Sequence, residues 1–131
     1  MAVWQPRAGT TLLMPSGPEG DHLFIVLNDP KTFPTYGPNP CVVLVSLSTV
    51  RAGAHYDMTC VLDPGSHAFV KRASYVAYRY ARIETVAHVA TLVEQGLFKP
   101  DDPMPSELLI AIRDGLRLSQ FTKREFKQLT I

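Results

Sequence analysis

Apolar runs bounded by turn-forming residues organise the first two thirds of the chain. Three of them, His22–Asn28, Cys41–Thr49 and Asp57–Leu62, follow one another, and a shorter β-prone run, Gly9–Met14, precedes them. A fourth strand-like run, Ser74–Ile83, is followed directly by a segment with helical periodicity. Short apolar runs separated by glycine and proline predict strands. Their order predicts a small barrel or curled sheet with helices appended at its C-terminal side.

Two of these runs carry more specific patterns. Cys41–Leu47 is apolar at almost every position, which predicts a central strand that is buried on both faces. Asp57–Leu62 alternates, which predicts one buried and one solvent-exposed face. The positions assigned to the buried face are Met58, Cys60 and Leu62, and those assigned to the exposed face are Asp57 and Thr59. A further short strand is expected at His67–Val70, and a long loop with four prolines at Asp29–Pro40.

The last third of the chain predicts helices. Thr85 is a suitable N-cap, Gly96 is a suitable C-terminal stop, and valines recur between them on one helical face. After a linker at Pro100–Pro105, Ser106 is expected to cap a second helix. Its apolar stripe consists of Leu108, Leu109, Ile112, Leu116 and Leu118. Thr122–Glu125 matches a capping box, which predicts a last short helix ending near Leu129.

Length and composition narrow the class of protein. With 131 residues, 46% hydrophobic and 19% charged, the chain suits one globular domain, with the barrel at about 9–84 and the helical part at about 85–131. Thirteen basic and twelve acidic residues give no global charge that indicates nucleic-acid binding. Cys41 and Cys60 lie in apolar runs and are expected to be reduced thiols. No signal peptide or membrane span is expected, so we expect a cytoplasmic protein with no membrane partner.

The order of these elements resembles the PemK/MazF-like toxins, a family of bacterial endoribonucleases built on an SH3-like barrel. Val45–Thr49 (VSLST) is similar to the family's V-P-L-T-S segment, and the end of Ser74–Glu84 is similar to its R-T-I-D strand. The following helix with Gly96 and Leu97 and the next helix with Ile112 and Leu116 continue the likeness, which covers roughly residues 9–119. The resemblance implies a mostly β fold with C-terminal helices (α+β), specifically a small SH3-like barrel.

The resemblance also implies an activity and its partners. It predicts a toxin of a toxin–antitoxin system that cleaves single-stranded RNA without a metal or another cofactor. A cognate antitoxin protein would hold it in check, and the chain would form a homodimer, with the apolar face of its C-terminal helices as a candidate contact. Cleavage of this kind needs a base for the 2′-hydroxyl, groups that stabilise the phosphorane and an acid for the leaving oxygen.

Eight residues have side chains that could supply chemistry of this type, and among them the resemblance favours the positions of Ser48, Thr49, Lys71 and Arg72. Histidine as a residue type changes charge near neutral pH, arginine and lysine neutralise phosphate, and hydroxyls donate hydrogen bonds to phosphate or base. The candidate catalytic residues are His67, Lys71, Arg72 and His22, and the candidate substrate-binding residues are Ser48, Thr49, Arg51 and Ser74. Each also has an ordinary structural explanation, as a turn former, a solvated cation or a histidine that satisfies backbone groups. His55 is expected in a solvated loop, and Arg79 is a further cation that could neutralise phosphate.

Two other functions remain open. The family's Arg-Pro before the second strand is Asp21-His22 here, and no carboxylate matches its acidic residue near Lys71. These differences favour a non-catalytic binding module on the same barrel. An adaptor that binds a partner through the proline-rich loop Asp29–Pro40 is the third hypothesis. A metal site built from His55, Asp57, Cys60 and His67 is not expected, because no pair has a zinc-like spacing.

Overall fold

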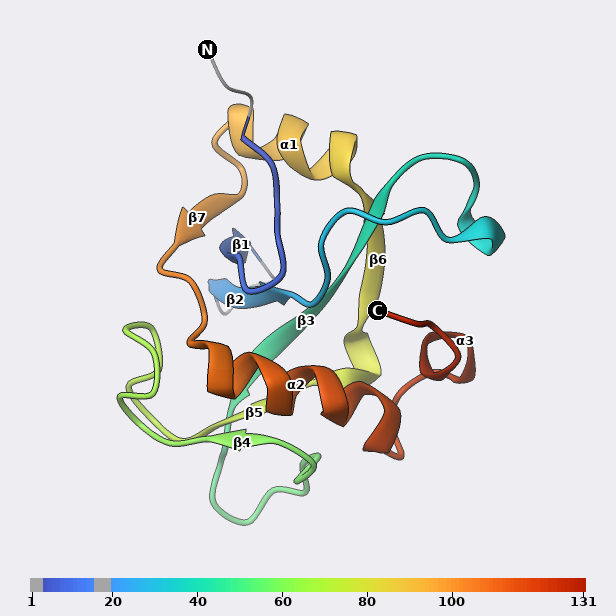
Figure 1. The fold of residues 1–131 in the computed structure, drawn as a ribbon. Coiled ribbons are helices and arrows are strands. Elements are labelled where there is room, and N and C mark those ends of the chain that lie inside the picture. The colour runs from blue at the N-terminus through green and yellow to red at the C-terminus, as the bar shows by residue number, and fades with distance from the viewer. Residues whose placement is uncertain (1–3, 16–19) are drawn as a thin grey trace.

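The structure is a computed structural model, and it describes residues 4–15 and 20–131. Within these residues an antiparallel sheet is combined with three α-helices and two short 3-10 helices (Figure 1). The strands are β1 (Thr11–Pro15), β2 (Asp21–Val26), β3 (Cys41–Thr49), β4 (Val61–Leu62), β5 (Ser74–Val76), β6 (Arg82–Thr85) and β7 (Lys99–Asp101). The helices are η2 (Pro34–Tyr36), η3 (Tyr78–Tyr80), α1 (Val86–Glu94), α2 (Ser106–Leu118) and α3 (Arg124–Lys127).

Strand β3 is the centre of the sheet, as its continuous apolar sequence predicts. The strand order is β4-β5-β3-β2-β1-β7, and β6 also pairs with β3. β6 pairs with Cys41–Leu44 and β5 with Leu47–Thr49, so one continuous segment lies along one edge of β3. The 3-10 turn η3 interrupts this segment between the two strands. There the Ala77 N–H still donates to the Ser46 carbonyl, at 2.8 Å, and the pairing then resumes in β6.

Successive side chains of β3 point to opposite faces of the sheet, and each face has its own core. On one face, Val43 and Val45 pack in a cluster with Ile112 and Leu116 of α2 and with Phe126 of α3. On the other face, Val42 and Leu44 pack in a second cluster with Val89 of α1 and with Phe98. Figure 1 shows α1 above the strands and α2 across their lower front. The sheet is therefore sandwiched between helices over part of each face.

Several local predictions are confirmed. β1, β2, β3 and the two halves of the fourth run form strands within a few residues of the expected positions. The Thr85 hydroxyl accepts a hydrogen bond from the His88 N–H at 3.2 Å, so Thr85 caps α1 as expected. Gly96 follows this helix with a φ of +75°, a conformation that favours glycine. Both cysteines are free thiols, Cys41 buried and Cys60 half-buried.

The prediction for Asp57–Leu62 is wrong. Only Val61 and Leu62 form a strand, Met58 is 73% exposed and Asp57 is 7% exposed, the reverse of the expected alternation for these two residues. Asp57 tolerates burial because Ser119 and Thr59 donate hydrogen bonds to its carboxylate. The strand expected at His67–Val70 is a turn instead, closed by a hydrogen bond from the Val70 N–H to the His67 carbonyl.

The C-terminal third differs in four details. The expected linker begins with β7, which pairs with β1, and Pro100 fits there because an edge strand tolerates a missing N–H. Ser106 is the first helical residue, and Pro105 takes the N-cap position. Leu118 lies outside the buried stripe of α2, with 72% of its surface exposed. The capping box does not form, because Lys123 is the N-cap of α3 and the buried Thr122 hydroxyl has no hydrogen-bond partner among the described residues.

Candidate functional site

The helix-covered sheet face that contains Val42 and Leu44 becomes polar as β3 approaches its end. The next positions on this face are Ser46 and Ser48, and Ser48 lies opposite Tyr75 of β5. Beyond Ser48 a hollow of about 180 Å³ opens. We call it the β3-end hollow, and it is lined by His22, Ser48, Thr49, Arg51, Ala54, His55, Tyr56 and Tyr75. Four of the eight site residues predicted from the sequence therefore meet here.

His22 reaches the β3-end hollow from β2. It lies two residues before Phe24, which pairs with Ser46 of β3, and so points to the same face of the sheet. Its Nδ1 atom is buried and has no hydrogen-bond partner among the described residues. The imidazole is thus packed at the wall of the hollow without a protein hydrogen bond to this nitrogen.

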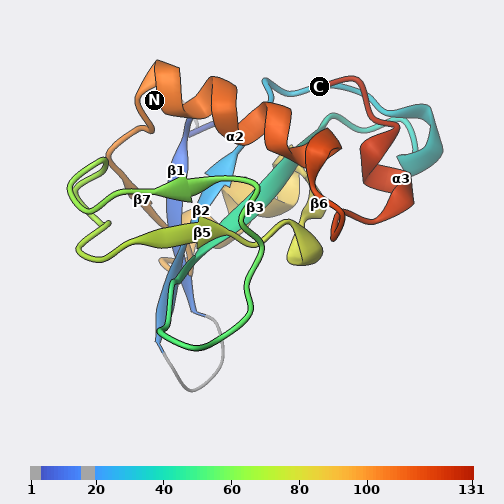
Figure 2. The ribbon, with the colours of Figure 1, turned by 90° about the horizontal axis from the view of Figure 1, so that it is seen from below.

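The segment after β3 supplies the opposite wall. Arg51, His55 and Tyr56 lie in the connection between β3 and β4, which extends from the sheet in Figure 2. Arg51 and His55 are exposed, whereas Tyr56 is half-buried against Tyr75. The two tyrosine rings are 5.3 Å apart between centroids and inclined by 32°. This ring contact holds the connection against β5.

Lys71, Arg72 and Ser74 lie at the same end of the sheet but do not line the hollow. The Val50 N–H donates to the Ala73 carbonyl at 2.9 Å. Arg72 directly precedes Ala73 and so lies near the end of β3. Lys71 and Arg72 are exposed. Ser74 is buried, and its hydroxyl donates to the Arg72 carbonyl at 2.9 Å.

His67 is separate from these residues and is already engaged. It is 5% exposed, its Nε2–H donates to the Asp102 carbonyl at 2.6 Å, and its Nδ1 accepts from the Phe69 N–H at 3.0 Å. A carbonyl only accepts, so this pair of contacts fixes the neutral Nε2–H tautomer. The ring joins the turn at His67–Val70 to the end of β7. This geometry gives His67 a structural role.

A second depression adjoins the first. It has a volume of about 370 Å³ and shares His55, Tyr56 and Tyr75 with the β3-end hollow. We call it the aromatic groove, and its other lining residues are Asp57, Ala77, Tyr78, Arg79, Tyr80 and Phe121. Sequence reasoning missed Tyr56 and Phe121, because no local pattern marks them. They reach the groove from the β3–β4 connection and from the turn after α2.

A buried polar network supports the groove. The Ser119 hydroxyl donates to one carboxylate oxygen of Asp57 at 2.5 Å, and the Thr59 hydroxyl donates to the other at 2.5 Å. Burial opposes ionisation of Asp57, but the hydrogen bonds from Ser119 and Thr59 outweigh it and hold its pKa below the usual range. Burial also raises the pKa of the Tyr78 hydroxyl far above its ordinary value. Asp57 is therefore a fixed anion and Tyr78 a neutral donor.

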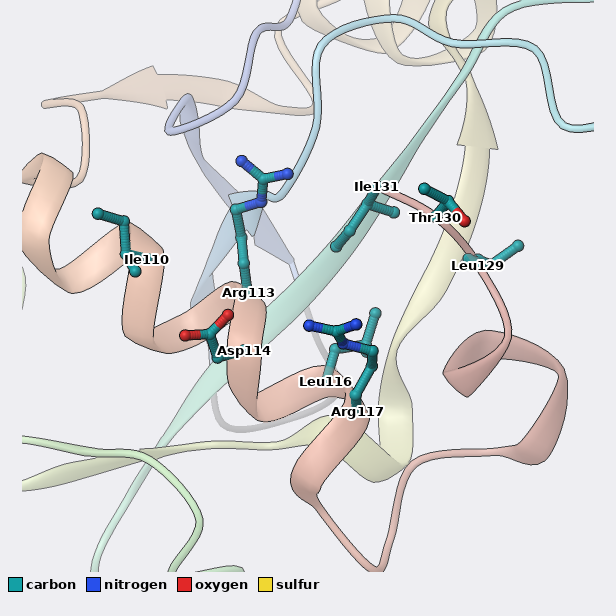
Figure 3. Close-up of a pocket in the computed structure, with 8 residues that line it drawn as sticks. All are labelled: Ile110, Arg113, Asp114, Leu116, Arg117, Leu129, Thr130 and Ile131. Carbon is teal, nitrogen blue, oxygen red and sulfur yellow. The ribbon is translucent and has the colours of Figure 1, made fainter.

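A third hollow lies on another part of the molecule. It has a volume of about 220 Å³ between α2 and the C-terminal residues. Figure 3 shows Arg113, Asp114 and Arg117 on α2, with Leu129, Thr130 and Ile131 across from them. None of the residues predicted from the sequence to form a site lines this hollow.

In residues 4–15 and 20–131, no group of three or more His, Cys, Asp or Glu side chains is arranged to hold a metal ion. None of the helices in this part of the chain has the length and apolar character needed to cross a bilayer. Comparison of the chain with protein-family models, curated proteins and solved structures found no significant match.

Proposed function

We propose that the protein is a metal-independent endoribonuclease that cleaves single-stranded RNA at the β3-end hollow. One observation carries this proposal: two imidazoles, two hydroxyls and a guanidinium come together there from β2, β3 and the β3–β4 connection. These are the groups that attack by a 2′-hydroxyl requires, since it needs a base, an acid and donors for the phosphorane. The resemblance to PemK/MazF-like toxins leads to the same chemistry from the sequence.

Each side chain has a defined task in this proposal. One of His22 and His55 accepts the proton of the 2′-hydroxyl as its oxygen attacks the adjacent phosphorus. The other donates a proton to the leaving 5′-oxygen, so the products carry a 2′,3′-cyclic phosphate and a 5′-hydroxyl. Arg51 neutralises the phosphorane, and Ser48 and Thr49 donate hydrogen bonds to phosphate oxygens or to a base.

This assignment revises the set expected from the sequence. His22, Ser48, Thr49 and Arg51 keep their proposed roles, and His55 takes the place of His67 as the second imidazole. Lys71 and Arg72, exposed at the same end of the sheet, contribute to phosphate attraction and not to bond cleavage. Ser74 shapes the start of β5 through its hydrogen bond to the Arg72 carbonyl.

The biological setting belongs to the same proposal. We propose an SH3-like barrel toxin that acts in the cytoplasm and is restrained by an antitoxin protein, as in the PemK/MazF-like family. A homodimer follows from that likeness too. Because the apolar stripe of α2 packs in the core, a dimer contact on this helix would use Ile110 and Leu118, which are 62% and 72% exposed.

Cleavage of labelled single-stranded RNA in the presence of EDTA tests the activity. We expect His22→Ala and His55→Ala each to lower the rate at least about a hundredfold, the usual scale for losing an acid or base. The matched control is His88→Ala, which removes an exposed imidazole from α1. Equal rates for wild type and both hollow variants would refute the assignment of these residues.

A non-catalytic RNA-binding module is the second candidate. The full engagement of His67 by backbone groups favours it, because one of the imidazoles expected to act in catalysis is not available. The same assay separates the two functions. A binding module would retain labelled RNA with micromolar or tighter affinity and leave it intact, and expression of the protein would not arrest growth.

A further inference from the structure

The aromatic groove exposes large side chains that a folded domain ordinarily buries. Tyr80 is 66% exposed and Phe121 is 44% exposed, and both line the groove. Tyr80 points outward because the 3-10 turn η3 replaces a strand at this point, so that Tyr78 enters the core and Tyr80 does not. Exposed aromatic side chains that gather in one depression mark a binding surface.

Contacts within the protein hold Phe121, Tyr56 and Tyr75 in place before any ligand arrives. The guanidinium of Arg79 lies 5.2 Å from the centre of the Phe121 ring, and Tyr56 packs against Tyr75. The Ser119 hydroxyl donates to Asp57 and accepts from the Phe121 N–H at 3.1 Å. This single hydroxyl therefore ties the segment between β3 and β4 to the turn that carries Phe121. A preformed surface loses little conformational entropy on binding.

The charges around the groove favour an anionic ligand with aromatic faces. Arg79 lies in the groove and Arg51 in the adjoining hollow. Asp57 also lines the groove as an anion, but it is 7% exposed and its carboxylate already accepts hydrogen bonds from Ser119 and Thr59, so it presents little surface to a ligand. A volume of about 370 Å³ falls within the usual range for sites that hold a small organic group. An unpaired nucleobase on a phosphate backbone fits these features.

We propose that the aromatic groove is a stacking subsite for an unpaired base of single-stranded RNA, next to the phosphate that reacts in the β3-end hollow. The inference rests on the proposed function and extends it, because the two depressions share His55, Tyr56 and Tyr75. A strand bound across both would place one base on the Tyr80 and Phe121 rings and the neighbouring phosphate near Arg51. Aromatic stacking of this kind tolerates any base, since each has a π face.

The test measures affinity without cleavage. A short, labelled 2′-O-methyl oligoribonucleotide cannot undergo attack by its 2′-oxygen, so fluorescence anisotropy reports binding alone. We expect Tyr80→Ala and Phe121→Ala to raise the Kd by about fivefold to a hundredfold, the range for losing one base–aromatic stack. Tyr80→Phe keeps the ring and should retain most of the affinity that Tyr80→Ala loses. Phe69→Ala removes an aromatic side chain, 37% exposed, from the separate turn at His67–Val70 and is the matched control.

A second arm identifies the contact. Abasic sites are introduced one at a time along the oligonucleotide. The abasic site that weakens binding to the wild type should leave the Kd of Tyr80→Ala unchanged. Wild-type affinity in both alanine variants, or no binding of RNA by the wild type, would overturn the subsite. Binding that depends on Tyr80 without any cleavage of unmodified RNA would preserve the subsite and reject the nuclease.

Discussion

Gly115 of α2 lies against the buried ring of Tyr78, and Gly115→Ala probes this contact. A Cβ atom at this position would lie 1.9 Å from the Tyr78 hydroxyl oxygen and 2.5 Å from Cζ. The ring has no room to withdraw, because Tyr78 is fully buried in the core between the sheet and α2. Its hydroxyl also donates to the Ile112 carbonyl at 2.7 Å, so any displacement breaks a buried hydrogen bond.

The change in the free energy of unfolding follows from two costs and one gain. Overpacking a core costs about 1–3 kcal/mol, and loss of a buried hydrogen bond adds about 1–3 kcal/mol. Replacing glycine by alanine in a helix interior returns about 1 kcal/mol through helix propensity. We therefore expect Gly115→Ala to lower the free energy of unfolding by about 1–5 kcal/mol.

Urea denaturation followed by circular dichroism measures this change. Asp114→Ala is the control, since it makes an alanine at the neighbouring exposed position and should leave stability unchanged or slightly raised. In a Tyr78→Phe background the closest clash disappears, so the cost of Gly115→Ala should shrink. A Gly115→Ala protein as stable as wild type would refute the packing of Tyr78 against this turn of α2.

Four further predictions concern buried polar groups. Ser119→Ala should lower stability by about 1–3 kcal/mol at neutral pH, because it removes a hydrogen bond to the ionised Asp57. Since folding lowers the pKa of Asp57, the stability from its ionised form is present above its unfolded pKa and is lost as pH falls through the folded value. Urea titrations from pH 7 into the acid range should therefore show a smaller loss of stability in Asp57→Asn than in wild type, and parallel losses would contradict this. His67→Ala should destabilise the fold by about 1–3 kcal/mol without a specific loss of RNA cleavage, and a folded variant with no activity would restore a catalytic role. Thr122→Val should be neutral or stabilising in thermal denaturation, because the buried Thr122 hydroxyl has no hydrogen-bond partner in the described part of the chain, and a clear drop in Tm would reveal one.

The sequence predicted the elements whose signals are local. The continuous aliphatic run of β3 is buried on both faces, and the Thr85 cap and the Gly96 stop of α1 form as expected. These features depend on residues close to each other in the chain, where propensity and periodicity act directly. The polar end of β3 was likewise visible in the sequence, and it positions Ser48 and Thr49 at the hollow.

Features that depend on distant partners were missed. Asp57 was expected at the surface because its hydrogen-bond donor Ser119 lies 62 residues away. The sequence predicted a linker in place of β7 because Pro100 disfavours a strand. Pro100 is tolerated there only because β7 is an edge strand beside β1. Dependence on distant partners also explains why Phe121 and Tyr56 were missed as site residues. They come together only because α2 packs on the sheet.

The chemistry of the RNA ends tests the central claim most directly. Unmodified single-stranded RNA is incubated with the protein in EDTA, and mass spectrometry identifies the new termini. The proposed mechanism requires a 2′,3′-cyclic phosphate and a 5′-hydroxyl, with no cleavage where a single 2′-deoxy nucleotide replaces the attacking one. Intact RNA, a 5′-phosphate product, or cleavage at the 2′-deoxy position would contradict RNA cleavage by His22 and His55.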